Sequence, residues 1–459
     1  MADNIGTTQP YLSERPETLA PKRENPRENN RVKPADRAVH DWYRFVLSFP
    51  PHLVRDCIER FGLSEKSCVL DPFCGTGTTL VECKKLGINT VGLEANPMPW
   101  FASHTKLNWS VPPRELLQHA QRVAEAAQTV LEDEGITDLQ QSPLFLRKGF
   151  EPRLRTLSEQ AASLILANSI SPLPLHKTLV LLETLERHAD NQFDAHERLA
   201  LAKAIVSDIS NLHFGPEVGV GTPKQDAVVI ASWLNRVSAI ARDLTLLPKS
   251  DASAAVVHRA DARGISSVLP PNSIDAVITS PPYPNEKDYT RTTRLESVLL
   301  GFAKTKDDLR AVKYDLIRSN TRSVYKSDED HFPVADNLEI QRIADAIEAR
   351  RIELKKTSGF ERLYAKLTKL YFGGMHRHLA DLRQVLRPGA QLAYVVGDQA
   401  SYLRVMIRTG NILADIAKSL GYQVIGIDLF RTRLATATGE QLREEVVLLR
   451  WPYNGSAFS

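Results

Sequence analysis

Cysteine is scarce in this 459-residue chain, and the four that occur, Cys57, Cys68, Cys74 and Cys83, fall within one short stretch. None is spaced as C-x-x-C, and no histidine pair stands nearby at the spacing of a zinc site. The spacing therefore gives no reason to expect a bound metal. We predict four reduced thiols in a protein core and no metal site.

Long hydrophobic runs are also missing. No window approaches about eighteen uninterrupted apolar residues, so a membrane-spanning helix is not expected. The N-terminal sequence MADNIGTTQPYLSERPET lacks a basic segment followed by an apolar one, which argues against secretion. These absences predict a cytoplasmic protein without a membrane partner.

Charge of one sign is not in large excess, because 58 Lys and Arg residues stand against 55 Asp and Glu residues, for a net charge of +3. This mildly basic balance permits a nucleic-acid partner and does not require one. Hydrophobic residues make up 42% of the chain and charged residues 25%, a globular mixture that excludes disorder of the whole chain. The length suits one large domain that carries insertions.

Composition and periodicity divide the chain into six segments. Residues 1–38 are rich in Pro, Asn, Glu and Arg without apolar periodicity, and we predict a disordered arm there. Residues 39–100, 251–300 and 360–459 contain short apolar strands alternating with helices, which indicates one α/β domain with a parallel sheet. Residues 101–250 show helical periodicity, and residues 301–359 are charged and mostly helical. The pattern predicts roughly seven strands, interrupted by a large and a second, smaller helical insertion.

A glycine-rich turn, DPFCGTGTT, follows the first predicted strand at residues 71–79. In an open α/β sheet, ligands bind outside the carboxyl ends of the strands, and Gly75 and Gly77 let the backbone approach a ligand closely. The N-terminus of the following helix favours an anionic group such as a carboxylate. Glu94 ends the next strand nineteen residues after Gly75, where an acid can accept both hydroxyls of a ribose. Although the third glycine of the dinucleotide fingerprint is absent, the turn and the acid together predict a nucleoside-containing cofactor.

A second site, TSPPY at residues 279–283, directly follows a buried strand. Two consecutive prolines fix the backbone and remove its donors, which leaves carbonyl groups free to accept hydrogen bonds. A hydroxyl, a rigid acceptor and an aromatic face within five residues suit a planar ring that bears an amino group.

Together, DPFCGTGTT and TSPPY resemble the motifs of the S-adenosylmethionine-dependent DNA amino-methyltransferases, which modify the exocyclic nitrogen of cytosine or adenine. The segment WYRFVLSFPPHLV, residues 42–54, resembles the N-terminal cofactor segment of that family. The resemblance covers about 40–100, 255–300 and 375–450. It implies a class I methyltransferase fold, with a Rossmann-like seven-stranded sheet whose last strand is antiparallel.

The resemblance also implies how S-adenosylmethionine would be held. Glu94 would accept the ribose hydroxyls, and Asp261, near the end of the third strand, the adenine amino group. Phe49 and Pro50 would close the methionine side. The residues that would line the methionine and adenosine moieties are Asp71, Phe73, Gly75, Gly77 and Thr78.

On the substrate side, the resemblance implies that Ser280 and the carbonyl of Pro281 accept hydrogen bonds from the target amine. Pro282 would hold the turn, and Tyr283 would stack on the base. An exocyclic amine is a poor nucleophile because its lone pair is delocalised into the ring. Hydrogen bonds to two fixed acceptors favour localising that pair, so positioning and electrostatic preorganisation supply the rate. The base must first be flipped out of the duplex.

Basic residues follow the second site closely. Between Lys287 and Lys326, ten Lys or Arg stand against five Asp or Glu, so this stretch could track phosphates. Arg291 and Arg294 lie nearest TSPPY and are the predicted DNA contacts. Residues 101–250 are a candidate DNA-recognition region, and a loop of unusual composition, 214–224, lies within them.

Within the family that the chain resembles, serine as the first residue of SPPY favours methylation at the N4 position of cytosine. The leading hypothesis is therefore a DNA methyltransferase that forms N4-methylcytosine, with DNA and a cognate restriction endonuclease as partners. The alternatives are N6-adenine methylation of DNA, methylation of tRNA, and a non-catalytic DNA-binding subunit. Carbon-5 methylation of cytosine is set aside, because its family has a Pro-Cys pair and none occurs here.

Overall fold

The computed structural model describes residues 32–44, 48–138, 153–214, 217–248, 253–285, 287–434, 439 and 441–453. Its centre is a seven-stranded sheet in the order β5-β2-β1-β6-β7-β9-β8. Neighbouring strands pair in parallel up to β7, whereas β9 runs antiparallel to both β7 and β8. The predicted sheet with an antiparallel last strand is confirmed. The strands are β1 (Cys68–Asp71), β2 (Asn89–Leu93), β5 (Ala255–His258), β6 (Ile274–Thr279), β7 (Leu386–Gly397), β8 (Gln423–Leu434) and β9 (Gln441–Arg450).

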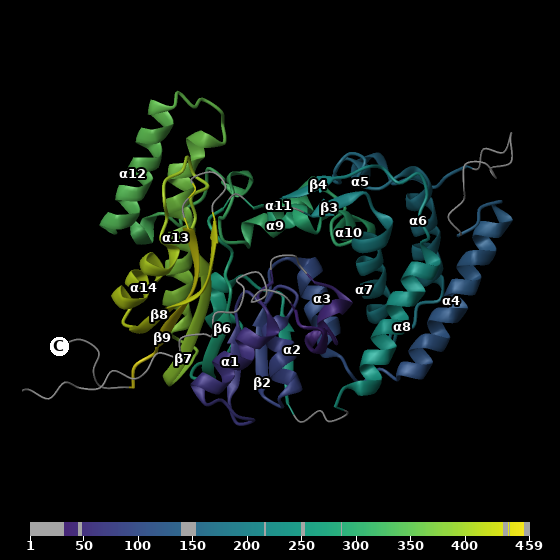
Figure 1. Cartoon of the computed structure of the whole chain (residues 1–459), viewed down its shortest axis with the longest axis horizontal. Coiled ribbons are helices and arrows are strands. Elements are labelled where there is room, and N and C mark those ends of the chain that lie inside the picture. Colours follow the sequence, from purple (N-terminus) through teal and green to yellow (C-terminus); the bar gives the residue numbers. More distant parts are fainter. Residues whose placement is uncertain are drawn as a thin grey trace, which may run out of the picture.

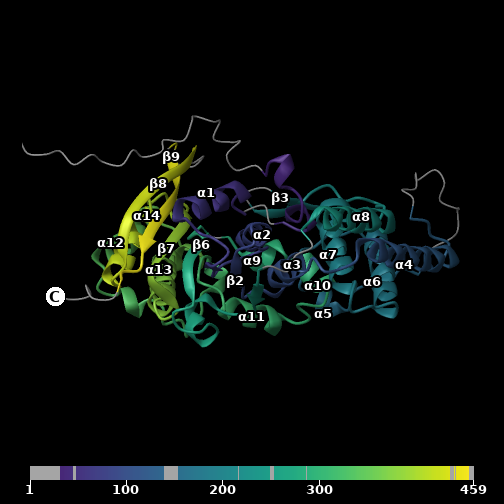
Figure 2. The same cartoon turned by 90° about the horizontal axis from the view of Figure 1, so that it is seen from below.

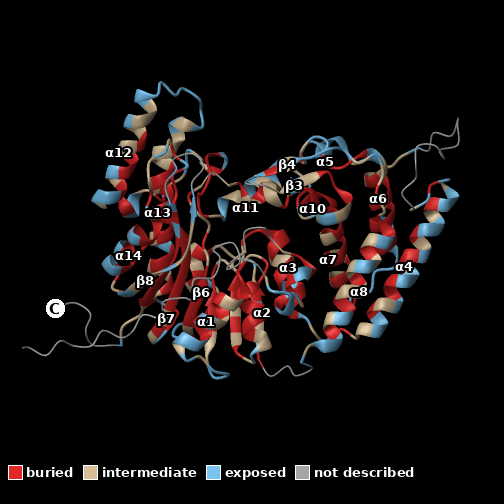
Figure 3. Ribbon diagram, viewed as in Figure 1, coloured by how far each residue is buried: buried red, intermediate tan, exposed pale blue. Residues whose placement is uncertain are grey.

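Helices cover both faces of the sheet because successive strand residues point to opposite sides. Leu70, Val277 and Leu392 face one core, which is covered by η5 (Ala262–Ser267), α13 (Tyr364–Leu382) and α14 (Thr409–Ser419). Their neighbours Val69, Ala276 and Ala393 face the other core, which includes α1 (Pro51–Phe61). The helices α2 (Thr78–Lys85) and α3 (Pro97–Leu107) also lie beside the sheet, and the buried strands stand out in Figure 3.

The large insertion is a group of helices at the opposite end of the molecule from β8 and β9 (Figures 1 and 2). Its predicted start at residue 101 falls inside α3, and this boundary is wrong because α3 packs against β5. Trp233 shares one core with Met98 of α3, so the insertion is continuous with the sheet domain. Its helices are α4 (Pro113–Asp133), α5 (Glu159–Ala162), α6 (Pro172–Arg187), α7 (Asp194–Ala204), the π-turn η4 (Ile205–Ile209) and α8 (Ile230–Leu246). Part of the loop predicted at 214–224 is instead paired, as β3 (Leu212–Phe214) with β4 (Val218–Val220).

The second insertion lies between β6 and β7 and is mostly helical, as expected. Its long helix α12 packs along α13 (Figure 1). The elements are α9 (Tyr289–Thr292), α10 (Arg294–Leu299), α11 (Lys306–Tyr314), η6 (Thr321–Ser323), η7 (Phe332–Val334), α12 (Leu338–Glu353) and η8 (Glu361–Leu363).

The predicted disordered arm, 1–38, extends too far along the chain. Residues 1–31 lie outside the described residues, but Pro34–Asp36 form the 3-10 turn η1, followed by η2 (His40–Trp42). Asp36 is buried and pairs with Arg55 of α1 at 3.0 Å, which fixes this part of the segment against the domain. Among the helices of the described chain, none is long and apolar enough to cross a bilayer.

Candidate active site

The glycine turn joins β1 to α2 with two residues in the left-handed backbone region, Gly75 (φ 52°) and Gly77 (φ 83°). Glycine adopts this conformation without steric cost, unlike residues with a Cβ. A Cβ on Gly77 would also lie 3.0 Å from the side chain of Ser103. The turn therefore depends on both glycines. Gly75 lines the cavity described below, whereas Gly77 precedes α2 and does not.

Glu94, just beyond β2, is tied directly to this turn. One carboxylate oxygen accepts the N–H of Gly75 at 3.0 Å, and the other accepts the N–H of Asn96 at 2.8 Å. Burial raises the pKa of Glu94 to about 7, although these N–H donors oppose the shift. The glycine turn and the acid, which were predicted to form one site, are thus joined by the hydrogen bond from Gly75 to Glu94.

Asp71 ends β1 and directly precedes the glycine turn. It is fully buried and does not line the cavity. One of its oxygens accepts the hydroxyl of Thr279 at 2.6 Å and the N–H of Phe73 at 3.2 Å. Burial raises its pKa to about 6. Asp71 therefore links the ends of β1 and β6, the two strands that present the glycine turn and the TSPPY segment. Its other oxygen is buried without a hydrogen-bond partner in the described part of the chain, and its cofactor contact stays a prediction.

In the TSPPY segment, the hydroxyl of Ser280 donates to the carbonyl of Val395 on β7 at 3.0 Å. Because that bond uses the only proton of the hydroxyl, the oxygen can act toward a substrate as an acceptor. The ring of Tyr283 lies against Gly397 at the end of β7, where a Cβ would be 2.9 Å from the ring. The last residues of β7 thus orient both the hydroxyl and the aromatic face.

One cavity of about 300 Å³ joins the two segments at the carboxyl ends of the parallel strands. This is the position at which open α/β sheets bind ligands, and the volume lies in the range of small-molecule sites. Pro50 is buried at the start of α1 and, contrary to prediction, does not line it. The predicted residues that line the cavity are Phe49, Phe73, Gly75, Thr78, Glu94, Asp261, Ser280, Pro281, Pro282 and Tyr283.

Much of the rest of the lining comes from segments that carried no motif. After α11, the stretch 315–323 of the second insertion supplies one wall, and the tip of the β8–β9 pair supplies another. Seven charged residues also line the cavity. They are Lys287, Asp288, Lys313, Asp315, Arg431, Arg433 and Glu444. The excess of basic residues after TSPPY was the one sequence signal for any of them.

The two arginines predicted to contact DNA lie outside this cavity lining. Arg294 is 17% exposed, and its guanidinium donates to the carbonyls of Thr290 at 3.1 Å and Leu164 at 3.3 Å. These bonds join α9 to the large insertion, and the DNA contact of Arg294 stays a prediction. Arg291 is 30% exposed and lies 4.0 Å from Glu217. Its DNA contact stays a prediction.

The contact between Tyr283 and Gly397 can be tested with Gly397→Ala. The added methyl group would displace the ring, and a shift of about 1 Å at a reacting centre can cost about a hundredfold in rate. We expect the turnover rate to fall at least about tenfold, while ligand affinity at the glycine turn changes by less than about twofold. Gly426→Ala on β8 is the matched control, since its Cβ would meet only Asp428 at 3.9 Å. Equal rates for both variants would contradict this role of Gly397.

A sheet of this strand order, with a cavity where β1, β2, β5 and β6 end, defines the class I methyltransferase fold. Sequence comparison gives the narrower relationship. Residues 14–98 match the DNA methylase family (N6_N4_Mtase). The chain is 26% identical over 440 residues to the type II methyltransferase M.BsoBI of Geobacillus stearothermophilus, covering 90% of this chain and 84% of the relative. It is 23% identical over 418 residues to the type II methyltransferase M.AvaI of Nostoc sp., covering 86% and 80%. The predicted resemblance to the DNA amino-methyltransferases is thereby confirmed.

Proposed function

We propose that this chain transfers a methyl group from S-adenosylmethionine to N4 of cytosine in a flipped-out DNA base. The observation that carries the proposal is the Ser280 hydroxyl, which donates to Val395 and so offers its lone pairs beside Tyr283. The same cavity contains the Glu94–Gly75 pair, so acceptors for a ribose and for an amine share one space.

The residues present fit S-adenosylmethionine. Glu94 is an acceptor suited to vicinal hydroxyls, Asp261 to a purine amino group, and Phe49 and Phe73 are apolar lining groups. The turn before α2 brings backbone N–H groups and a helix N-terminus, which suit the carboxylate of the methionine part. This cofactor supplies an electrophilic methyl group on a sulfonium.

The chain itself would position the acceptor base. Ser280 and the carbonyl of Pro281 would each accept a hydrogen bond from the exocyclic amine, which favours a localised lone pair on nitrogen. Tyr283, held by Gly397, would stack on the ring and offset part of the cost of unstacking, which is on the order of a few kcal/mol. Cytosine is the proposed base because the first residue of the SPPY segment is serine, which in the family that this chain resembles favours the N4 position of cytosine.

For the DNA backbone, the geometry favours Lys287 and Arg433 over the arginines predicted first. Both line the cavity beside Tyr283, and burial together with the positive charge of Arg433 lowers the pKa of Lys287. The carboxylates of Glu217 and Glu444 oppose this lowering of the pKa of Lys287 without cancelling it. Arg433 is 3.8 Å from Glu444, which Arg431 already binds through two nitrogens. A phosphate would relieve the repulsion between these two cations.

Salt dependence tests whether these two residues bind phosphates. Each phosphate that a variant no longer neutralises lowers the slope of log affinity against log salt by about one unit. We expect this change in Lys287→Ala and in Arg433→Ala, measured by fluorescence anisotropy with duplex DNA. Arg342→Ala is the control, because Arg342 is 68% exposed, pairs with Glu339 on α12 and lies outside both the basic stretch and the cavity lining. A slope equal to that of the wild type in both variants would remove these residues from the interface.

The function itself is tested by methyl transfer from labelled S-adenosylmethionine to duplex DNA and, in parallel, to tRNA, followed by nucleoside mass spectrometry. N4-methylcytosine in DNA is the expected product. N6-methyladenine in DNA would agree with the proposed mechanism but would show that the target base is adenine. Label in tRNA alone would show that DNA is not the substrate. We also propose a cognate restriction endonuclease as partner, because the relatives are type II methyltransferases. DNA modified by this chain should resist that nuclease.

A further inference from the structure

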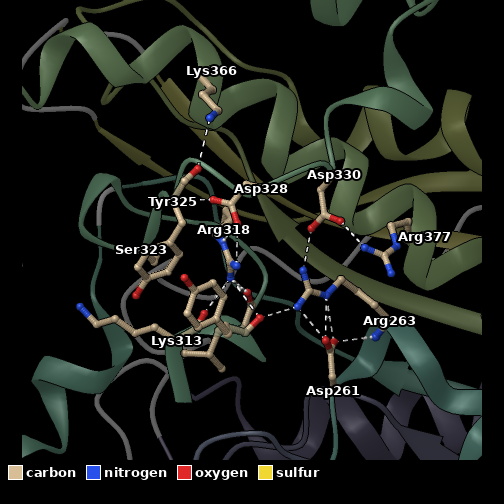
Figure 4. Close-up of polar contacts among 12 residues, drawn as sticks. Asp261, Arg263, Lys313, Arg318, Ser323, Tyr325, Asp328, Asp330, Lys366 and Arg377 are labelled. Carbon is tan, nitrogen blue, oxygen red and sulfur yellow. Dashed lines mark hydrogen bonds and ion pairs between the residues drawn. The ribbon is translucent and has the colours of Figure 1, made fainter. Parts of the chain in front are cut away.

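Arg263, on η5, has a side chain that is only 9% exposed and joins Asp261 to two segments of the second insertion (Figure 4). Its Nε donates to both carboxylate oxygens of Asp261, at 3.0 Å to Oδ1 and 2.9 Å to Oδ2, and Nη2 donates to Oδ2 at 2.7 Å. Nη1 donates to Asp330 at 2.6 Å, and Nη2 also donates to the carbonyl of Tyr314 at 2.6 Å. Burial alone would lower the pKa of Arg263, but its bonds to the two carboxylates outweigh burial and raise it.

Asp261 is the member of this group that reaches the cavity. Its side chain is 29% exposed, whereas that of Arg263 is 9% exposed. Besides the guanidinium, the backbone N–H of Arg263 donates to Asp261 at 2.8 Å. A planar guanidinium that binds both oxygens of a carboxylate fixes the plane of that carboxylate. The direction in which Asp261 offers its remaining lone pairs is therefore set by Arg263.

The other two contacts of Arg263 fix the second insertion. Tyr314 ends α11, and the cavity wall formed by 315–323 follows directly. Asp330 is held from its other side by Arg377 of α13 at 2.6 Å. The backbone of Asp330 passes so close to Gly373 of α13 that a Cβ there would clash with the Asp330 carbonyl. Arg263 thus connects a wall anchored on α13 to the acid in the cavity.

We propose that Arg263 is a positioning residue, which aims Asp261 at the amino group of the cofactor's adenine and holds the 315–323 wall over it. This inference rests on the proposed function and adds a specificity determinant to it. A carboxylate accepts the amino group of adenine but repels the carbonyl oxygen that hypoxanthine has in the same place. Sites built to pair with one polar group reject its mismatched analogue strongly. Selection of adenine over hypoxanthine therefore depends on Arg263.

The test compares binding of S-adenosylhomocysteine and S-inosylhomocysteine by calorimetry. We expect the wild type to prefer the adenine ligand at least about tenfold and Arg263→Met to prefer it by less than about threefold. Arg377→Met is the matched control. Arg377 is the other arginine that pairs with Asp330. It is 52% exposed and does not contact Asp261, so this variant should keep the wild-type preference for the adenine ligand. Arg263→Lys keeps the charge without the planar fork, and should give an intermediate preference.

A purely structural role would weaken both ligands equally and leave their ratio unchanged, and that result would overturn the inference. A wild type that binds both ligands equally would also overturn it. Thermal unfolding of each variant checks that it is folded, and Arg263→Lys supplies the ratio if Arg263→Met does not fold. Failure of the wild type to bind S-adenosylhomocysteine or to methylate DNA would instead remove the proposed function.

Discussion

Replacing Ser280 with alanine is expected to reduce methyl transfer by about a hundred- to a thousandfold, the cost typical of removing one preorganised polar group from an active site. The hydroxyl is held by Val395 at 3.0 Å, so its orientation is set before substrate binds. Without it, one of two proposed acceptors for the amine is missing, and the nitrogen lone pair is less localised. Single-turnover rates with labelled cofactor and duplex DNA measure the loss.

The same variant should bind S-adenosylhomocysteine within about twofold of the wild type, because Ser280 is proposed to touch the base and not the cofactor. Ser323→Ala is the matched control. Its hydroxyl also lines the cavity, but it donates to the carbonyl of Asn320 at 2.8 Å within the second insertion. We expect Ser323→Ala to keep nearly full activity. A fully active Ser280→Ala variant would show that Ser280 takes no part in methyl transfer. A tenfold loss of cofactor affinity would show that Ser280 contacts the cofactor and not the base.

The sequence predicts the part of the site that is local in the chain. The contact between Gly75 and Glu94 spans 19 residues within one strand–turn–helix–strand unit, and the geometry of that unit brings the two together. The seven-stranded sheet with its antiparallel last strand follows from the same pattern together with the family resemblance. The placement of the two motifs at one edge of the sheet follows in turn, because parallel strands present their carboxyl ends on the same side.

Partners from distant segments could not be predicted in this way. Val395 comes 115 residues after Ser280, and Thr279 lies 208 residues from Asp71. No spacing rule relates such positions, and an aspartate that opens a glycine turn looks the same in sequence whether it faces a ligand or a neighbouring strand. Arg294 shows the same limit for a surface residue. Its charge and position suggested a surface contact, whereas the backbone carbonyls that bind it become apparent only in the fold.

Glu94→Gln is expected to weaken binding of S-adenosylhomocysteine by about ten- to a hundredfold at pH 8, since a hydrogen bond to a charged group contributes about 1.5–3 kcal/mol. The amide keeps the shape of the side chain but removes its charge and replaces one acceptor with a donor. Calorimetry measures the affinity. An unchanged dissociation constant would exclude Glu94 from the ribose site.

The pH dependence gives a second, independent test of Glu94. Burial raises its pKa to about 7, so the free protein holds this proton more tightly than the unfolded chain does. The resulting contribution to stability is fully present below the ordinary pKa of about 4.5 and is lost as the pH rises through 7. Cofactor affinity runs in the opposite direction, because accepting both ribose hydroxyls requires the ionised form. Between pH 8 and pH 6 the wild-type dissociation constant should therefore rise by about tenfold.

Glu94→Gln isolates this effect, because the amide does not titrate and any protonation of the ligand affects both proteins equally. The ratio of the two dissociation constants should be largest at pH 8 and should shrink by about tenfold at pH 6. A ratio that is constant across this range would mean that Glu94 is already ionised at pH 6. The bonds from Gly75 and Asn96 would then outweigh burial in setting its pKa, and the glycine turn, more than the cavity, would determine its charge.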